Sequence, residues 1–156
     1  MVAPLRLWRL CRSIYADEAF SGRGAYLLGG RWSPPGAGVV YCADSRSLAA
    51  MEVLVHHIGT GVFRDSLWVQ IAADVPSDLV EIPARVPGEW REPSPVASVQ
   101  AFGAAWFREQ RSVALRVPSS VVLGEFNYLL NPAHPEFKRV KLGQPEPFNF
   151  DPRLGK

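Results

Sequence analysis

Apolar and polar residues alternate with period two in several short segments of the chain, which is the pattern of a strand that buries one face. Other segments are short runs of β-branched and aromatic residues, which are typical of strands inside a sheet. Together these patterns predict strands over residues 5–10, 39–42, 67–73, 79–82, 113–117 and 138–142.

Two longer segments have apolar residues spaced by three and four positions, which predicts helices over residues 45–59 and 97–110. The first helix has Asp44 or Ser45 as its N-cap, and Gly59 ends its pattern. The second contains a glycine at position 103, but its apolar spacing continues through it.

The helix over residues 45–59 has two neighbouring stripes of side chains. The stripe that we expect to face the core consists of Leu48, Met51, Val55 and Ile58. Ala49, Glu52 and His56 form the other stripe, so a carboxylate and an imidazole lie beside the expected core-facing edge.

The remaining segments predict connections. Residues 11–30 contain few periodic apolar positions and predict a long loop with a turn of helix near residues 17–20. The prolines between residues 83 and 95 predict a surface connection rather than a linker between domains. Residues 121–123 are apolar, but a Pro-Ser-Ser stop precedes them. Strands and helices mixed in this order predict an α+β fold.

The composition fits one domain over residues 1–156, because 47% hydrophobic residues in this length are enough for a single core. Its 17 basic and 15 acidic residues give a net charge of +2, which requires neither a nucleic acid nor a membrane surface as partner. Cys11 and Cys42 lack the spacing of a zinc site or a disulfide scaffold. The first residues resemble neither a signal peptide nor a membrane span, so we expect a cytoplasmic protein.

An arginine surrounded by backbone-permissive residues is the first candidate for chemistry. Arg31 lies in the segment Gly29-Gly30-Arg31-Trp32-Ser33-Pro34-Pro35-Gly36. Glycines let a backbone approach a ligand closely, prolines stiffen the chain, and a guanidinium binds a phosphate or carboxylate through two parallel N–H groups. The segment therefore predicts a site for an anionic small molecule.

Further motifs follow this arginine in a characteristic order. They are Trp8-Arg9, Gly29-Gly30-Arg31-Trp32, Tyr41, Glu52, Val117-Pro118-Ser119, Asn127 and Asn131-Pro132-x-His134-Pro135. In this order the chain resembles the RES-domain family, the toxin halves of bacterial toxin–antitoxin pairs, which are named for an arginine, a glutamate and a serine. The resemblance extends from about Leu7 to Leu154.

The resemblance implies a strongly bent, mixed and largely antiparallel sheet with flanking helices, similar to ADP-ribosyltransferase toxins, and NAD⁺ as substrate. The catalytic residues that it implies are Arg31, Tyr41, Glu52 and Ser119, with Arg9, Asn127 and His56 as additional NAD⁺-binding residues. Arg31 would anchor the dinucleotide, Tyr41 would pack on it, Glu52 would stabilise the ribose cation and Ser119 would orient the nicotinamide amide. Ser120 adjoins the motif serine, and the sequence does not choose between them.

Each of these residues also has a structural alternative. Arg31 could pair with Glu52, and Tyr41 could belong to the core beside two valines. Glu52 could instead pair with His56 along the helix surface. Ser119 could be a turn residue after a proline.

Other chemistries are poorly supported. The chain lacks a G-x-S-x-G elbow, which argues against a serine hydrolase. Its three histidines have no metal-binding spacing, so we expect no metal. The implied partner is a co-encoded helix-turn-helix (Xre-like) antitoxin that blocks the active site. The acceptor of ADP-ribose stays open among a protein, water and phosphate.

Two functions from other classes remain. One is a small RNA-binding module, in which Trp8, Trp32, Tyr41 and the basic segment Lys138-Arg139-x-Lys141 contact bases and phosphates. The other is an interaction protein that binds the antitoxin without catalysis.

Overall fold

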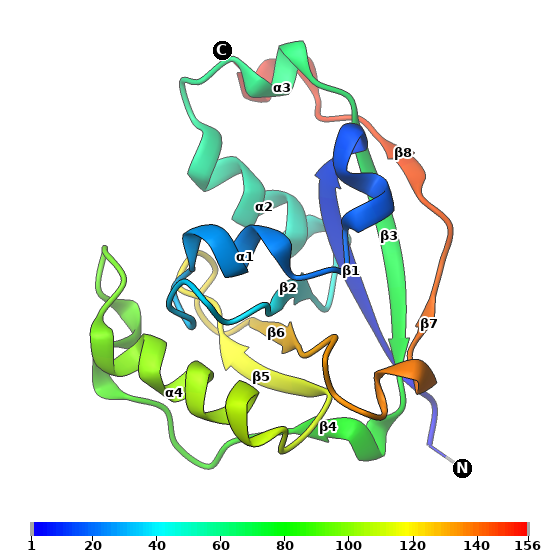
Figure 1. Cartoon of the computed structure of the whole chain (residues 1–156). Helices are drawn as coiled ribbons and strands as arrows, with labels where there is room; N and C mark the ends of the chain where they lie inside the picture. Colours follow the sequence, from blue (N-terminus) through cyan, green and yellow to red (C-terminus); the bar gives the residue numbers. More distant parts are fainter. Residues whose placement is uncertain (1, 156) are drawn as a thin grey trace.

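One curled, mixed sheet is the centre of the computed structural model, which describes residues 2–155 (Figure 1). The strand order is β4-β5-β6-β2-β1-β3-β7, and β8 also pairs with β3. All pairs are antiparallel except β4 with β5. The strands are β1 (Leu5–Arg12), β2 (Val40–Ala43), β3 (Trp68–Val75), β4 (Val80–Glu81), β5 (Ala114–Pro118), β6 (Phe126–Leu130), β7 (Lys141–Leu142) and β8 (Glu146–Phe148).

The sheet bends between β1 and β2. These two strands share the single register pair Trp8↔Ala43, whereas β1 pairs with β3 over its whole length. Figure 1 accordingly shows β1 and β3 running nearly at right angles to β2, β6 and β5. The sequence-based prediction of a single α+β domain with a strongly bent mixed sheet is therefore confirmed.

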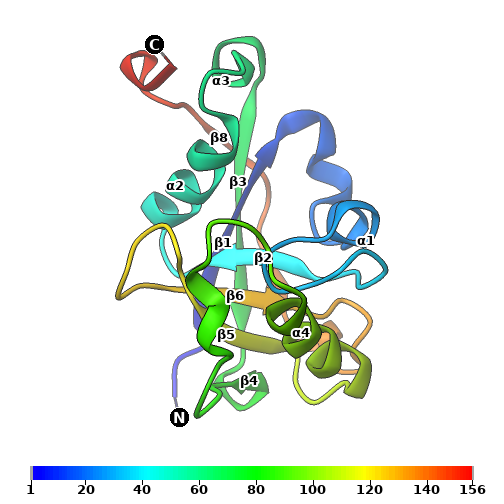
Figure 2. The ribbon, with the colours of Figure 1, turned by 90° about the vertical axis from the view of Figure 1, so that its left-hand side faces the viewer.

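Helices cover both arms of the bent sheet (Figure 2). Helix α2 lies over the arm that contains β1 and β3, and α4 lies over β5 and β6. The α-helices are α1 (Arg23–Leu28), α2 (Arg46–His57), α3 (Val62–Asp65) and α4 (Ala97–Glu109). Short 3-10 helices are η1 (Ser13–Glu18), η2 (Ser77–Leu79), η3 (Gly88–Arg91), η4 (Phe137–Arg139) and η5 (Pro152–Gly155). None of the helices within residues 2–155 combines the length and apolarity that a membrane span needs.

Several predicted elements need correction. Residues 11–30 are not one long loop, because β1 continues to Arg12 and η1 and α1 follow. The apolar residues 121–123 belong to the connection between β5 and β6, and β6 begins only at Phe126. The sequence analysis missed β6 because its period-two pattern is hidden: its last three residues are buried on both faces between β2 and β5. The predicted strand over 138–142 keeps only β7, since η4 takes up its first residues.

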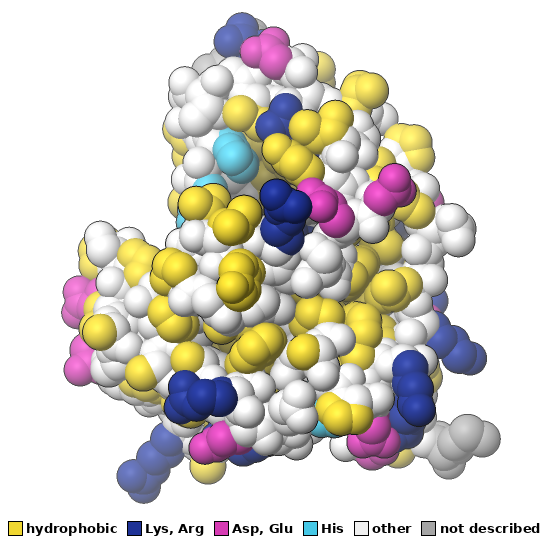
Figure 3. Space-filling model, viewed as in Figure 1, with side chains coloured by type: hydrophobic (Ala, Val, Ile, Leu, Met, Phe, Trp, Pro, Cys, Tyr) yellow, Lys and Arg dark blue, Asp and Glu magenta, His cyan; other side chains and the backbone are white. Residues whose placement is uncertain are grey.

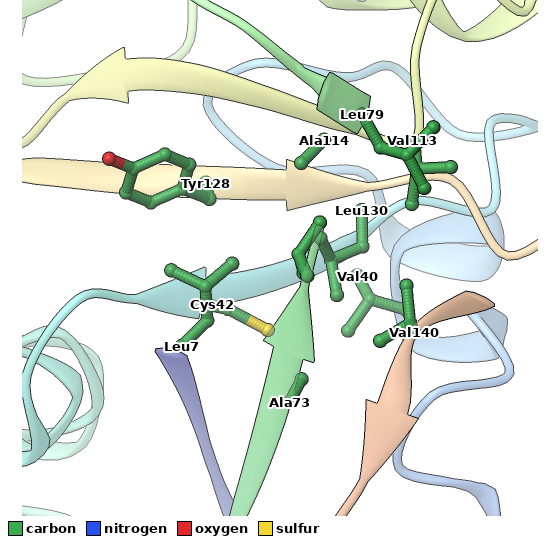
Figure 4. Close-up of a cluster of buried hydrophobic side chains, with 11 residues drawn as sticks. Leu7, Val40, Cys42, Ala73, Leu79, Val113, Ala114, Tyr128, Leu130 and Val140 are labelled. Carbon is green, nitrogen blue, oxygen red and sulfur yellow. The ribbon is translucent and has the colours of Figure 1, made fainter. Parts of the chain in front are cut away.

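Residues on one face of the sheet form a cluster that joins the two arms (Figure 4). Its buried members are Leu7, Val40, Cys42, Ala73, Val75, Leu79, Val113, Ala114, Tyr128, Leu130 and Val140. Alternate strand residues point to the opposite face and enter two separate clusters, one under α2 and one under α4. The opposite face is therefore divided into two cores, which lie on either side of the bend.

Helix α2 is rotated relative to the sequence-based prediction. Met51, Val55 and Ile58 were expected to face the core, but they are 43%, 47% and 72% exposed. Leu48 of the same predicted stripe is buried as expected, together with Ala49, and the Ser45 hydroxyl accepts the N-cap hydrogen bond from the Leu48 amide. As a result, the side of α2 that carries Glu52 faces the sheet.

His57, in the last turn of α2, packs against a cluster of aromatic side chains. The ring of His57 packs edge-on against Phe63 and Trp68, at centroid distances of 6.0 and 5.9 Å. Burial, and then the neighbouring charges of His56 and Arg12, lower the pKa of His57 below its ordinary value of 6.5. The pKa of His57 is lower in the folded chain than in the unfolded chain, so neutral His57 contributes stability at a pH above the unfolded-state pKa. This contribution to the free energy of unfolding is lost as the pH falls through the folded-state pKa.

We therefore expect the urea midpoint to fall on acidification from about pH 7 to about pH 5, and to fall less in His57→Gln than in the wild type. His56→Gln removes a neighbouring charge that lowers the pKa of His57, so it should also reduce the fall, but by less than His57→Gln. Equal pH dependence of the wild type and His57→Gln would contradict the assignment.

Candidate active site

Glu52 is held by two side chains that are remote in the sequence. Its Oε1 accepts hydrogen bonds from Ser119 Oγ at 2.8 Å and from Asn127 Nδ2 at 2.6 Å. Glu52 projects from α2, Ser119 follows the end of β5, and Asn127 lies in β6. The structure thus brings three of the sequence-predicted residues together in one hydrogen-bonded group.

The local fold around Ser119 fixes the direction of its hydroxyl group. Ser119 is fully buried, and its Oγ accepts hydrogen bonds from the amides of Val121 and Val122 at 3.1 and 3.0 Å. Its hydrogen is therefore free to be donated to Glu52. Within the described residues, Ser120 makes no side-chain hydrogen bond, so Ser119 is the serine that contacts the carboxylate.

Tyr41 ties the arginine-bearing segment to β2. Its hydroxyl accepts a hydrogen bond from the Trp32 amide at 3.1 Å and forms another with Ser33 Oγ at 2.8 Å. Gly30 lies against the ring, since a Cβ at that position would be 2.6 Å from the Tyr41 hydroxyl oxygen. Burial raises the pKa of Tyr41, while the bonds from Ser33 and Trp32 and the charge of Arg31 act in the opposite direction. The sequence analysis missed this role of Ser33, which no periodic pattern indicates.

Arg31 does not pair with Glu52, in contrast to the structural alternative that the sequence left open. Its Nη1 instead donates to the backbone oxygens of Trp90 and Glu92 at 2.9 and 2.6 Å. Among residues 2–155 no hydrogen bond of its Nε or Nη2 is found. Half of the guanidinium group therefore secures the connection around η3, and the other half remains available for a ligand.

The register of the sheet places Tyr41 and the Glu52 group on one face. Ala43 is opposite Asn127 and Tyr41 is opposite Leu129, so Tyr41 and Asn127 are diagonal neighbours on adjacent strands. Such side chains are about 7–8 Å apart. Figure 2 shows this region of β2 and β6 between α2 and α4, and Figure 3 shows an indented outline between the parts that carry these helices.

Arg9 and His56 lie outside the Glu52 group. Arg9 donates to the backbone oxygens of Ala19 and Tyr41, each at 3.2 Å, and lines a cavity of about 50 Å³ together with Tyr41 and residues of the 18–25 segment. It is therefore linked to the site through β2. His56 is exposed and, within the described part of the chain, forms no ion pair with Glu52. In residues 2–155 no three histidine, cysteine or acidic side chains are grouped as metal ligands.

The Tyr41 hydroxyl allows a direct stability test. Tyr41→Phe leaves the Trp32 amide and the Ser33 hydroxyl without their partner in a buried environment, and we expect it to cost about 1–3 kcal/mol of unfolding free energy. Ser33→Ala removes one of the same hydrogen bonds, so the double variant should cost less than the sum of the two. Urea titrations measure all three variants, and fully additive costs would show that the two hydroxyls do not interact.

Comparisons with known proteins show the family of this chain. The model of the family described as RES domain matches residues 6–151. The Prs ADP-ribosylating toxin of Sphingobium sp. (strain YBL2) is 38% identical, with 94% of each chain covered. A protein named Toxin Res from Photorhabdus laumondii is 38% identical, covering 96% of this chain and 97% of the relative, and one from Yersinia enterocolitica is 34% identical, covering 96% and 99%.

A solved structure shows the same fold. It is the crystal structure of the M. tuberculosis MbcT-MbcA toxin-antitoxin complex, which superimposes with a TM-score of 0.75 at 19% identity. The match covers 94% of this chain and 85% of that chain. The bent sheet and its flanking helices are thus shared with a protein that differs at most positions.

Proposed function

The chain belongs to the RES-domain family, and on that premise we propose that it is a bacterial toxin that cleaves the nicotinamide–ribose bond of NAD⁺. The observation that carries the proposal is the carboxylate of Glu52, whose Oε1 is fixed by Ser119 and Asn127 on the face of the sheet that also carries Tyr41. Such a fixed charge can act on a cationic transition state without first having to reorganise.

The proposed reaction begins with breakage of the bond between nicotinamide and ribose C1′. The electron pair of that bond leaves with nicotinamide, which becomes neutral, and the ribose becomes oxocarbenium-like. Oε2 of Glu52 accepts a hydrogen bond from a ribose hydroxyl, and the carboxylate stabilises the developing positive charge. The acceptor then adds to C1′ and releases its proton to solvent.

Ser119 and Asn127 have a supporting role in this proposal. The Ser119 hydroxyl and the Asn127 amide both donate to Glu52, so they hold the carboxylate in one orientation. This assignment replaces the expectation that Ser119 orients the nicotinamide amide, because its single O–H is already directed at Glu52.

The pyrophosphate of NAD⁺ is assigned to the arginines. Arg31 has its Nε and Nη2 edge available, and a guanidinium edge matches two phosphate oxygens. Arg9 reaches the backbone of Tyr41 from the neighbouring cavity, so both arginines are connected to the same strand residue. The positive charge of Arg31 near Tyr41 supports a dinucleotide that extends from there toward Glu52.

The name of the Sphingobium relative supports a protein as the ADP-ribose acceptor. Incubation of the purified chain with NAD⁺ tests the proposal through release of nicotinamide. Parallel reactions with water alone, with inorganic phosphate, and with cell lysate and labelled NAD⁺ distinguish hydrolysis, phosphorolysis and protein modification. Absence of nicotinamide release under all three conditions would contradict the proposed activity.

We propose that a co-encoded helix-turn-helix (Xre-like) antitoxin neutralises the chain by covering this site. The solved structure of the same fold is a toxin-antitoxin complex, and apolar side chains of α1 and α2 form an exposed surface beside the site (Figure 3). This surface includes Tyr26, Leu27, Leu28, Met51 and Val55. Co-expression of the neighbouring gene should restore growth, and a purified complex should release no nicotinamide.

The basic carboxy-terminal segment offers little support for an RNA-binding module. Arg139 is paired with Asp78 at 3.0 Å and with Glu136 at 3.1 Å, so its charge is already balanced. A titration with single-stranded RNA at low and high salt tests this alternative, because phosphate contacts make affinity strongly dependent on salt.

A further inference from the structure

The backbone on both sides of Arg31 packs against helix α4. Gly103 is buried in the middle of this helix, and a Cβ there would lie only 1.8 Å from the backbone oxygen of Trp32. Glycine within a helix costs stability relative to alanine, so its presence is explained by this close approach. The Trp32 ring also packs edge-on against Phe102, with centroids 6.0 Å apart.

Gln100 holds the other side of the same segment. Its Nε2 donates a hydrogen bond of 2.9 Å to the backbone oxygen of Gly30. Gln100 and Gly103 are three positions apart on α4, so they lie on one face of the helix. The peptide oxygens of Gly30 and Trp32, the two residues that flank Arg31, are therefore both placed by α4.

The side chain of Arg31 starts from this fixed backbone and is then anchored by the oxygens of Trp90 and Glu92. Tyr41 holds the same segment through the Trp32 amide. Because Gln100 and Gly103 fix the peptide oxygens on either side of Arg31, loss of either contact lets the guanidinium group shift relative to the Glu52 carboxylate. Binding of a pyrophosphate through two parallel N–H groups is sensitive to such a shift.

We propose that Gln100 and Gly103 are positioning residues that set the placement of Arg31 for binding of the NAD⁺ pyrophosphate. The inference rests on the proposed function, and neither residue touches the reacting atoms. Because Arg31 binds a phosphate that is present in both the ground state and the transition state, loss of its placement raises KM and leaves kcat nearly unchanged.

The experiment measures nicotinamide release for Gln100→Ala and for Gln100→Met, which has a similar length and no charge but lacks the N–H donor. Both variants should raise KM for NAD⁺ by about three- to tenfold, as expected for one lost hydrogen bond, with kcat within about twofold of the wild type. Gln144→Ala, at an exposed position away from the site, is the matched control and should leave both constants unchanged.

A double-mutant cycle separates positioning from general destabilisation. In an Arg31→Ala background, Gln100→Ala should have no further effect on KM, because the guanidinium group that Gln100 places is already absent. An unchanged KM in Gln100→Ala, or an equal increase with and without Arg31, would overturn the inference while leaving the proposed function intact. A wild-type chain that releases no nicotinamide would overturn both.

Gly103→Ala is a second, stronger perturbation. The added methyl group must displace the Trp32 oxygen, so we expect a larger increase in KM than in Gln100→Ala. Circular dichroism and urea titration report whether this variant folds, and the Gln100 variants decide the inference if it does not. A folded Gly103→Ala with wild-type KM would contradict the role of Gly103.

Discussion

Glu52→Gln is expected to lower kcat for nicotinamide release by about 10²–10³-fold, the usual cost of removing one preorganised electrostatic group. Glutamine has nearly the same shape, and its side-chain oxygen can still accept the hydrogen bonds from Ser119 and Asn127. What it lacks is the negative charge that stabilises the oxocarbenium-like ribose. The loss should therefore be in the chemical step, while the fold and antitoxin binding remain.

Steady-state kinetics with NAD⁺ and a urea titration are the two measurements for this variant. The matched control is Glu125→Gln, an identical change at an exposed carboxylate close to Asn127 in sequence. It should retain wild-type activity. The Glu52 variant should also lose growth inhibition while it still binds the antitoxin. Toxicity that persists in Glu52→Gln would support a non-catalytic interaction protein instead.

Trp106→Ala is expected to destabilise the chain by about 3–5 kcal/mol, the range for truncating a large buried aromatic residue. Trp106 is fully buried in the cluster under α4, together with Leu115, Val117 and Leu129. Its indole N–H also donates to Ser112 Oγ at 2.7 Å, and Ser112 in turn donates to the Ala114 oxygen at 2.8 Å. The substitution therefore creates a cavity and leaves the half-buried Ser112 hydroxyl with one partner fewer.

Urea unfolding at neutral pH measures this cost, with Trp106→Phe as an intermediate variant. Phenylalanine keeps most of the buried surface and loses the hydrogen bond, so it should cost distinctly less than alanine. The same cluster contains Trp32, which is next to Arg31. Activity should therefore fall together with stability, because the segment that carries Arg31 loses part of its packing. Equal costs for the two substitutions would show that packing volume is not the main contribution.

Local patterns were sufficient to predict β1, β3, α2 and α4, because each contains a spacing or a run of apolar residues that is typical of its kind of element. They failed for β6, whose last three residues are buried on both faces and therefore do not alternate. They also failed for α1, a short helix whose six residues include none that is buried. In both cases the neighbouring strands or loops, rather than local preference, decide the conformation.

The rotation of α2 is the clearest case of a decision made by tertiary structure. The spacing of Met51, Val55 and Ile58 indicated a core-facing stripe, yet these side chains are exposed. Of the predicted stripe only Leu48 is buried, and it packs together with Ala49 in the cluster that contains Trp68. This orientation turns Glu52 toward β6, where Asn127 and Ser119 can satisfy its oxygen. The favourable free energy of packing on a buried aromatic cluster and of two hydrogen bonds is thus larger than the free energy lost by leaving three apolar side chains exposed.

By itself, the sequence determined the family and the order of the motifs. Only the tertiary structure decided which of these residues meet: Ser119 rather than Ser120 contacts Glu52, and Arg31 is anchored to backbone oxygens instead of Glu52. The reason is distance along the chain. Glu52 is 67 residues from Ser119 and 75 from Asn127, so their contacts depend on where the sheet bends and how α2 is rotated, which no local pattern of residues contains.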